Sequence, residues 1–71
     1  MKYTVVIEKG ESSYGAFVPD LPGCIAAGES RSETLNLIKE AIEFHIEGII
    51  EAGESVPSPH CDITHVDVNA A

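Results

Sequence analysis

The chain has 71 residues, and its twelve aspartates and glutamates against four lysines and arginines give a formal net charge of −8. A domain this small buries only roughly 60% of the surface of its unfolded chain, so self-association is an expected source of further buried surface. The negative charge disfavours direct binding of nucleic acid or of anionic membranes. No apolar run approaches the roughly 20 residues that cross a bilayer.

The N-terminal part of the chain predicts an antiparallel sheet. Residues 3–8 are rich in β-branched and aromatic side chains, and the polar residues 9–13 suit a hairpin loop. Residues 14–18 are the expected returning strand, and residues 24–28 are expected to form a third strand. Because Met1 leads directly into strand-like sequence and the chain has two cysteines, we expect a cytoplasmic protein with reduced thiols and no signal peptide.

A double-proline segment separates the second and third strands. Pro19 and Pro22 each fix φ and lack an N–H donor, so a strand has to end near Val18 and another begin near Cys24. Pro22-Gly23 suits the central positions of a type II turn, in which the glycine has a positive φ.

A long helix is predicted from Arg31 to Ala52. Ser30 and Glu33 fit the capping-box pattern at its start, and Gly53 suits the position after its end. One apolar stripe has the spacing of a helix that packs on a sheet. The stripe consists of Leu35, Ile38, Ile42, Ile46 and Ile49.

Two other faces of this helix are candidate interaction surfaces. An apolar shoulder makes the helix more hydrophobic than one sheet contact requires, which predicts a dimer or tetramer interface. The shoulder consists of Leu37, Ala41, Phe44 and Gly48. Gly48 either allows close approach of another backbone or only weakens the last turn of the helix. The acidic face contains Glu40, Glu43, Glu47 and Glu51, and it suits either a solvated surface or a docking ridge for a basic partner.

We expect one domain over residues 1–71, with residues 53–59 as a linker and residues 60–71 as a terminal strand and tail. The alternation in residues 63–68 predicts this strand, which either joins the sheet as a fourth strand or is donated to a neighbour. The expected fold is therefore α+β, with the order β-β-β-α-β.

Several residues with chemical potential do not form a recognisable catalytic or metal motif. Cys24 falls at an expected buried strand position, and His45 lies at the edge of the helix core stripe. His60, Cys61 and His65 lack the paired cysteines of common zinc sites. Asp62 and Asp67 are the remaining candidates, for magnesium. We predict no enzyme, no metal and no cofactor, and we keep a metal-dependent hydrolase as the last-ranked alternative.

The chain resembles the HicB-like antitoxin family. The resemblance rests on residues 14–24, which read YGAFVPDLPGC, followed by GES at 28–30 and EAIEFH at 40–45. It implies a small α+β domain that assembles into oligomers, binds a small basic HicA-type ribonuclease toxin and covers the catalytic histidine of that toxin.

The resemblance, together with the negative charge, suggests which residues meet the toxin. The expected contacts are Asp20, Leu21 and Pro22 in the turn and Glu40, Glu43 and Glu47 on the helix. Many members also carry a C-terminal DNA-binding domain, for which the dozen residues after Pro59 are too few, so we expect the short, single-domain form. The alternative is an oligomeric structural or small-ligand-binding domain without a toxin partner.

Overall fold

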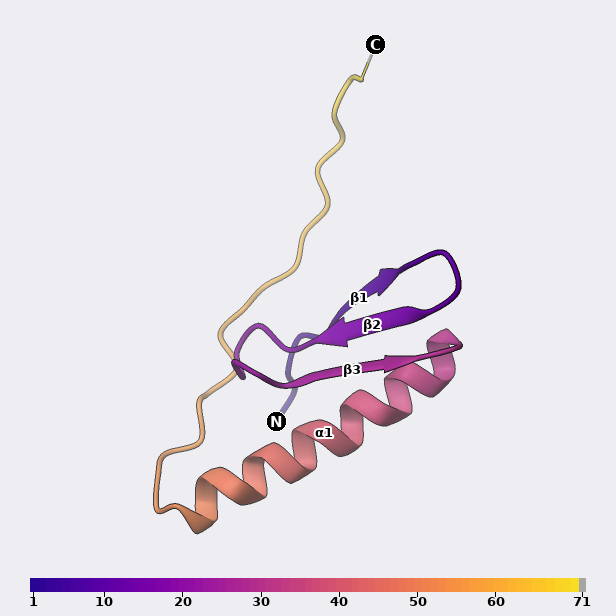
Figure 1. Cartoon of the computed structure of the whole chain (residues 1–71). Coiled ribbons are helices and arrows are strands. Elements are labelled where there is room, and N and C mark those ends of the chain that lie inside the picture. The colour runs from indigo at the N-terminus through magenta and orange to yellow at the C-terminus, as the bar shows by residue number, and fades with distance from the viewer. Residues whose placement is uncertain (71) are drawn as a thin grey trace.

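The computed structural model describes residues 1–70, which form three strands and one helix. The strands are β1 (Val6–Lys9), β2 (Tyr14–Phe17) and β3 (Ile25–Gly28), and the helix is α1 (Arg31–Glu51). The strands form an antiparallel sheet in the order β1-β2-β3, and α1 runs across one face of it (Figure 1). This arrangement confirms the predicted α+β class and the predicted meander. Within residues 1–70, no helix is long and apolar enough to span a membrane.

The two faces of the sheet differ because neighbouring side chains on a strand point to opposite sides. Ile7, Ala16 and Ala26 are aligned across the three strands, and all three belong to the hydrophobic core with α1. Val6, Phe17 and Ile25 are aligned in the adjacent row and therefore point away from the helix. Ile25 is 70% exposed, so the outer face of the sheet is partly apolar and open to solvent.

The core lies between α1, the sheet and the proline turn. Leu21 of the turn and Ile38 of the helix are the most completely buried large apolar side chains, at 0% and 1% exposure. Val18, Ala16 and Cys24 complete the buried cluster. In the predicted core stripe of the helix, Ile38 is buried and the other members are half-buried, so this assignment is confirmed; these are Leu35, Ile42, Ile46 and Ile49.

The proline segment folds into two consecutive turns. The N–H of Leu21 donates to the carbonyl of Val18 at 3.1 Å, and the N–H of Cys24 donates to the carbonyl of Leu21 at 3.0 Å. Gly23 has a φ of +84°, as the predicted type II turn requires. The N–H of Val18 also donates to the carbonyl of Cys24 at 3.2 Å, which closes the base of the segment.

Both ends of α1 match the sequence pattern to within one residue. The Ser30 hydroxyl accepts a hydrogen bond from the N–H of Glu33 at 3.1 Å, so Ser30 is the N-cap. At the other end, Gly53 has a φ of +74° and donates to the carbonyl of Ile50, while Glu54 donates to that of Ile49. This pair of bonds is a Schellman motif, and it ends the helix just before the linker.

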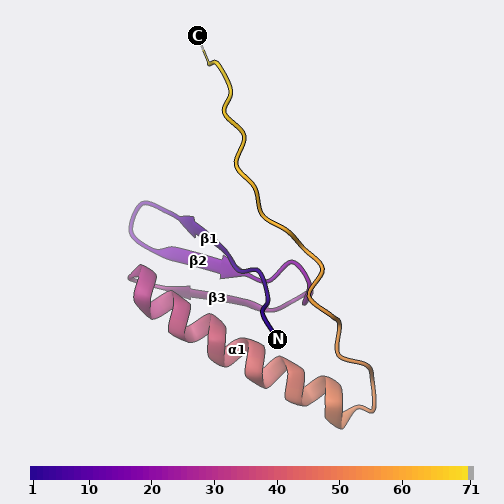
Figure 2. The same cartoon turned by 180° about the vertical axis from the view of Figure 1, so that it is seen from behind.

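The predicted fourth strand is not formed within residues 1–70. Residues 54–70 are extended, but they pair with no strand of the sheet. They run from the end of α1 past the proline turn and then away from the body of the domain (Figures 1 and 2). Residues 62–70 are exposed, so they lack the burial that would favour a fixed sheet position in a single chain.

Candidate functional site

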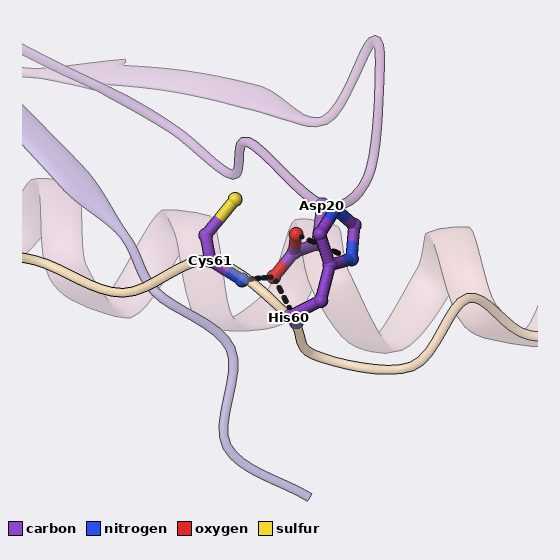
Figure 3. Close-up of side chains that lie close together, drawn as sticks. All are labelled: Asp20, His60 and Cys61. Atoms are coloured by element: carbon purple, nitrogen blue, oxygen red, sulfur yellow. Dashed lines mark hydrogen bonds and ion pairs between the residues drawn. The ribbon is translucent and has the colours of Figure 1, made fainter.

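The proline turn and the C-terminal segment meet at the carboxylate of Asp20. Its Oδ2 accepts hydrogen bonds from the backbone N–H groups of His60 at 3.1 Å and Cys61 at 3.3 Å. Its Oδ1 lies 3.0 Å from Nδ1 of the His60 ring. The Asp20 side chain is fully buried, whereas that of His60 is 72% exposed. Figure 3 shows the carboxylate between the His60 ring and the Cys61 backbone.

Two further hydrogen bonds attach the same segment to the N-terminal residues. The Tyr3 hydroxyl donates to the carbonyl of Pro57 at 2.5 Å, and the Thr4 hydroxyl donates to that of Cys61 at 3.2 Å. Residues 57–61 are therefore attached at three points, by Tyr3, Thr4 and Asp20. We call residues 57–61 the anchored segment.

The contacts around Asp20 change the pKa values of two groups. The Cys61 thiol and the backbone N–H groups of His60 and Cys61 lower the pKa of the Asp20 carboxyl, and these influences outweigh burial, which raises it. The same interaction with Asp20 is the main cause that raises the pKa of the Cys61 thiol, with burial and the charge of Asp20 acting in the same direction. Asp20 is therefore ionised, and Cys61 remains a thiol at neutral pH.

The turn residues expected to contact a partner differ in their exposure. Asp20 is 3% exposed and Leu21 is completely buried, so their side chains shape the turn and form none of its outer surface. Pro22 is exposed at the tip of the turn. Within the expected contact set, the turn therefore presents Pro22 together with backbone groups.

The acidic face of α1 is open to solvent. Glu40, Glu43, Glu47 and Glu51 are all exposed and project from one side of the helix, over about three turns. Lys39 is the basic residue nearest to them in sequence. Exposure of these four residues is compatible both with a solvated surface and with a docking ridge for a basic partner.

The apolar shoulder is also exposed. Phe44 is 79% exposed and Leu37 is 37% exposed, whereas Ala41 packs partly against the core. A Cβ added to Gly48 would have no atom within 4 Å, so no contact within the chain requires a glycine there. Exposed apolar side chains on one face of a helix are the kind of surface that proteins commonly use for association.

A cavity of about 300 Å³ lies between the N-terminal segment and α1. Its lining is mostly apolar, with Lys39 and Glu43 as its charged members, and it places Met1 and Tyr3 opposite the helix. The full lining is Met1, Tyr3, Val5, Leu35, Ile38, Lys39, Ile42 and Glu43. The cavity adjoins the acidic face, because Glu43 belongs to both.

The other candidate side chains are scattered. Cys24 is 3% exposed, and burial raises the pKa of its thiol, which agrees with the predicted structural role and disfavours a nucleophile. His45 is half-buried on α1, whereas Asp62 and Asp67 are exposed in the tail. His65 is also exposed in the tail, outside the cluster that contains His60 and Cys61.

The pairing of Asp20 with the anchored segment is not apparent from the amino-acid sequence. Spacing along the chain groups His60 and Cys61 with the nearby His65. A signal for the true partner was present, since aspartates in turns commonly accept hydrogen bonds from backbone N–H groups. That signal does not identify a donor 40 positions away.

Taken together, the structure is a two-layer α+β domain with an acidic helix face and an anchored C-terminal segment. A family model described as the HicB-like antitoxin of bacterial toxin-antitoxin systems matches residues 3–70. The chain therefore belongs to the HicB-like antitoxin family.

The chain is similar to three further proteins. It is 49% identical over 57 residues to an uncharacterised 14.9 kDa protein of Haemophilus phage HP1, covering 80% of this chain and 43% of the phage protein. The N-terminal domain of antitoxin HicB from Burkholderia pseudomallei has a TM-score of 0.77 and 36% identity, covering 89% of this chain and 74% of that domain. A chain of the HicA3–HicB3 toxin-antitoxin complex has a TM-score of 0.71 and 32% identity, with coverage of 84% and 70%. The chain thus spans less than half of the phage relative.

Proposed function

We propose that this protein is a non-catalytic antitoxin that binds a small basic HicA-type ribonuclease toxin and blocks its active site. The observation that carries the proposal is the structural similarity to a chain of the HicA3–HicB3 complex, together with the family membership. The mechanism is steric, so the protein needs no reacting group of its own. It would act in the cytoplasm, without binding nucleic acid or membranes itself.

The acidic face of α1 is the proposed docking ridge. Glu40, Glu43 and Glu47 are exposed on the helix, and the chain has a formal net charge of −8. A basic partner would be attracted to such a surface, which raises the association rate at low ionic strength. Pro22, exposed on the proline turn, is the second proposed contact.

Binding to a toxin tests this proposal directly. The experiment mixes the purified protein with the product of a small basic HicA-type reading frame adjacent to its own and follows both by size-exclusion chromatography. We expect a co-eluting complex whose association rate falls as salt is raised from about 50 to 500 mM, because the Debye length shortens over that range. Two folded proteins that elute separately at low salt would contradict the proposal for that toxin.

We also propose that the protein self-associates through the apolar shoulder. Phe44 and Leu37 are exposed on α1, and a Cβ added to Gly48, four residues after Phe44, would have no atom within 4 Å. The tail offers a second element for assembly, because Ile63 and Val66 are exposed in extended chain that a neighbouring sheet edge could pair with.

A small-ligand-binding domain is the alternative function, and the cavity between the N-terminal segment and α1 favours it. Its volume of about 300 Å³ is at the lower end of the range for ligand pockets. An apolar fluorescent probe that binds with a defined stoichiometry, and is excluded by the bulkier Leu35→Trp variant, would support this alternative. Leu35→Trp should leave toxin binding intact if the acidic face is the docking surface.

A further inference from the structure

Three metal-ligating side chains converge where the proline turn meets the anchored segment. One donor atom from each of Asp20, His60 and Cys61 lies within 4.8 Å of the other two. Asp20 comes from the turn, and the other two are consecutive residues of the segment, as Figure 3 shows. The cluster therefore brings together oxygen, nitrogen and sulfur donors from two parts of the chain 40 positions apart.

The carboxylate is incompletely satisfied. Oδ2 of Asp20 accepts both backbone hydrogen bonds, but Oδ1 is buried without a hydrogen-bond partner. Nδ1 of His60 lies 3.0 Å from Oδ1, and the same nitrogen lies 3.1 Å from the carbonyl oxygen of Ser58, to which a protonated Nδ1 donates. The contact between Nδ1 and Oδ1 is an ion pair only while the His60 ring is protonated; beside a neutral ring the buried carboxylate oxygen is costly, since such groups are normally paired or coordinated to a metal. Oδ1 and Nδ1 are close enough to bind a common cation once Nδ1 loses its proton and gives up the contact with Ser58.

The donor set favours zinc among the divalent metals. Carboxylate, imidazole and thiolate are all common zinc ligands, whereas magnesium and calcium prefer oxygen alone. Ligands of a tetrahedral zinc ion lie about 3.5 Å apart, so the Asp20 and His60 donors, at 3.0 Å, would separate slightly, whereas any pair further apart would move closer. The half-buried Cys61 and the exposed His60 have the freedom to move in this way.

We propose that Asp20, His60 and Cys61 form a zinc site that fastens the anchored segment to the proline turn. Three ligands from the chain leave one position for water or for a group on a partner molecule. His60 is 72% exposed, so the fourth position can open towards solvent. Bound zinc would supply the positive charge beside Oδ1 of Asp20 that a neutral His60 ring does not provide.

Zinc titration of the reduced, chelator-treated protein tests this site. Zinc chloride is added in competition with a colorimetric chelator, and Co²⁺ is used separately to detect a thiolate ligand by its charge-transfer absorption. We expect one zinc per chain and a thiolate-to-cobalt band. Loss of a direct ligand should cost at least the roughly 10–100-fold in affinity that is typical for loss of a group hydrogen-bonded to a ligand.

Matched variants in the C-terminal residues separate this site from adventitious binding. His60→Ala and Cys61→Ser should each weaken zinc binding at least tenfold, and Cys61→Ser should abolish the cobalt band. His65→Ala removes the other tail histidine and should change neither. Both tail histidines are exposed, so circular dichroism should show that these variants remain folded.

Three results would overturn the proposal. The first is the absence of zinc binding at concentrations up to those of the competing chelator. The second is equal affinity in Cys61→Ser and the unchanged chain, and the third is equal losses in His60→Ala and His65→Ala. In each of these cases, Asp20 and His60 form an ion pair only. The titration contains no toxin, so its outcome does not depend on the proposed antitoxin function.

Discussion

The Asp20 carboxylate accepts a hydrogen bond from the backbone N–H of Cys61, a residue 41 positions further along the chain. This contact, with its neighbour at His60, explains why a buried charge occurs in a turn that has no basic side chain beside it in sequence. Asp20 therefore serves to attach the C-terminal segment. At this turn, the surface available to a partner is formed by exposed residues such as Pro22, and the Asp20 side chain is not part of it.

Attachment of the segment should depend on pH. The folded pKa of Asp20 lies below its ordinary value, so ionised Asp20 favours the attached segment above the unfolded pKa of about 3.9. This contribution is lost as the pH falls through the lower, folded pKa. We expect the amide NMR signals of His60 and Cys61 to move together towards those of unstructured chain in that acid range. The Asp20→Asn variant should lack this transition, and an unchanged transition in that variant would assign it to another carboxyl group.

Gly28→Ala should destabilise the fold by about 1–3 kcal/mol. An added Cβ at this position would lie 2.7 Å from Oγ1 of Thr34, which is buried against the end of β3. Gly15→Ala is the matched control, because the nearest atom to its added Cβ is at 4.0 Å. Urea denaturation of both variants measures the difference. Equal losses of unfolding free energy would show that α1 and β3 are not closely packed at Gly28.

Phe44→Glu should shift the protein towards monomer, because it introduces a charge into the apolar shoulder. Phe44 is 79% exposed and makes no part of the core, so the fold should tolerate the change. Light scattering after size-exclusion chromatography measures the mass. Ile50→Glu adds the same charge at an exposed apolar position outside the shoulder and should leave the mass unchanged. An equal effect of the two variants would place the interface elsewhere.

Gly48→Ala distinguishes the two interpretations of this glycine. If only the helix matters, alanine should stabilise the protein by about 1 kcal/mol, because the space beside Gly48 is open within the chain. If a second backbone approaches there, alanine should instead weaken the oligomer. We expect weaker association, measured as a raised dimer dissociation constant.

Glu43→Lys combined with Glu47→Lys should weaken toxin binding and reduce its dependence on salt. Both residues are exposed on the acidic face of α1. The control is Glu8→Lys with Glu11→Lys, which makes the same change in net charge at the exposed β1–β2 hairpin. Association rates measured at several salt concentrations separate the two. Equal effects would mean that the partner responds to overall charge and that α1 is not the docking ridge.

Local signals predicted most of the fold. The serine at position 30, the glycines at 23 and 53 and the prolines at 19 and 22 each impose a backbone geometry on their immediate neighbours. Those geometries fix the turn and both ends of α1, and they were predicted to within one residue. Apolar spacing likewise identified the core face of the helix.

The C-terminal segment was predicted less well, because its position depends on contacts that are distant in sequence. The alternating residues 63–68 have a strand-like pattern, but pairing also requires a partner edge, and within residues 1–70 they have none. Residues 57–61 are instead held by hydrogen bonds that the Tyr3 and Thr4 hydroxyls donate to them and by those that Asp20 accepts from them. Burial of Asp20 and Leu21 was likewise not apparent from their place in a polar-looking turn.

Inhibition of toxin activity is the most direct test of the antitoxin proposal. Cleavage of an RNA substrate by a HicA-type toxin that the protein binds is measured while this protein is added in increasing amounts. We predict that cleavage falls in proportion to the added protein and stops at a fixed stoichiometric ratio. Full cleavage in the presence of an excess of folded protein would contradict the proposed function.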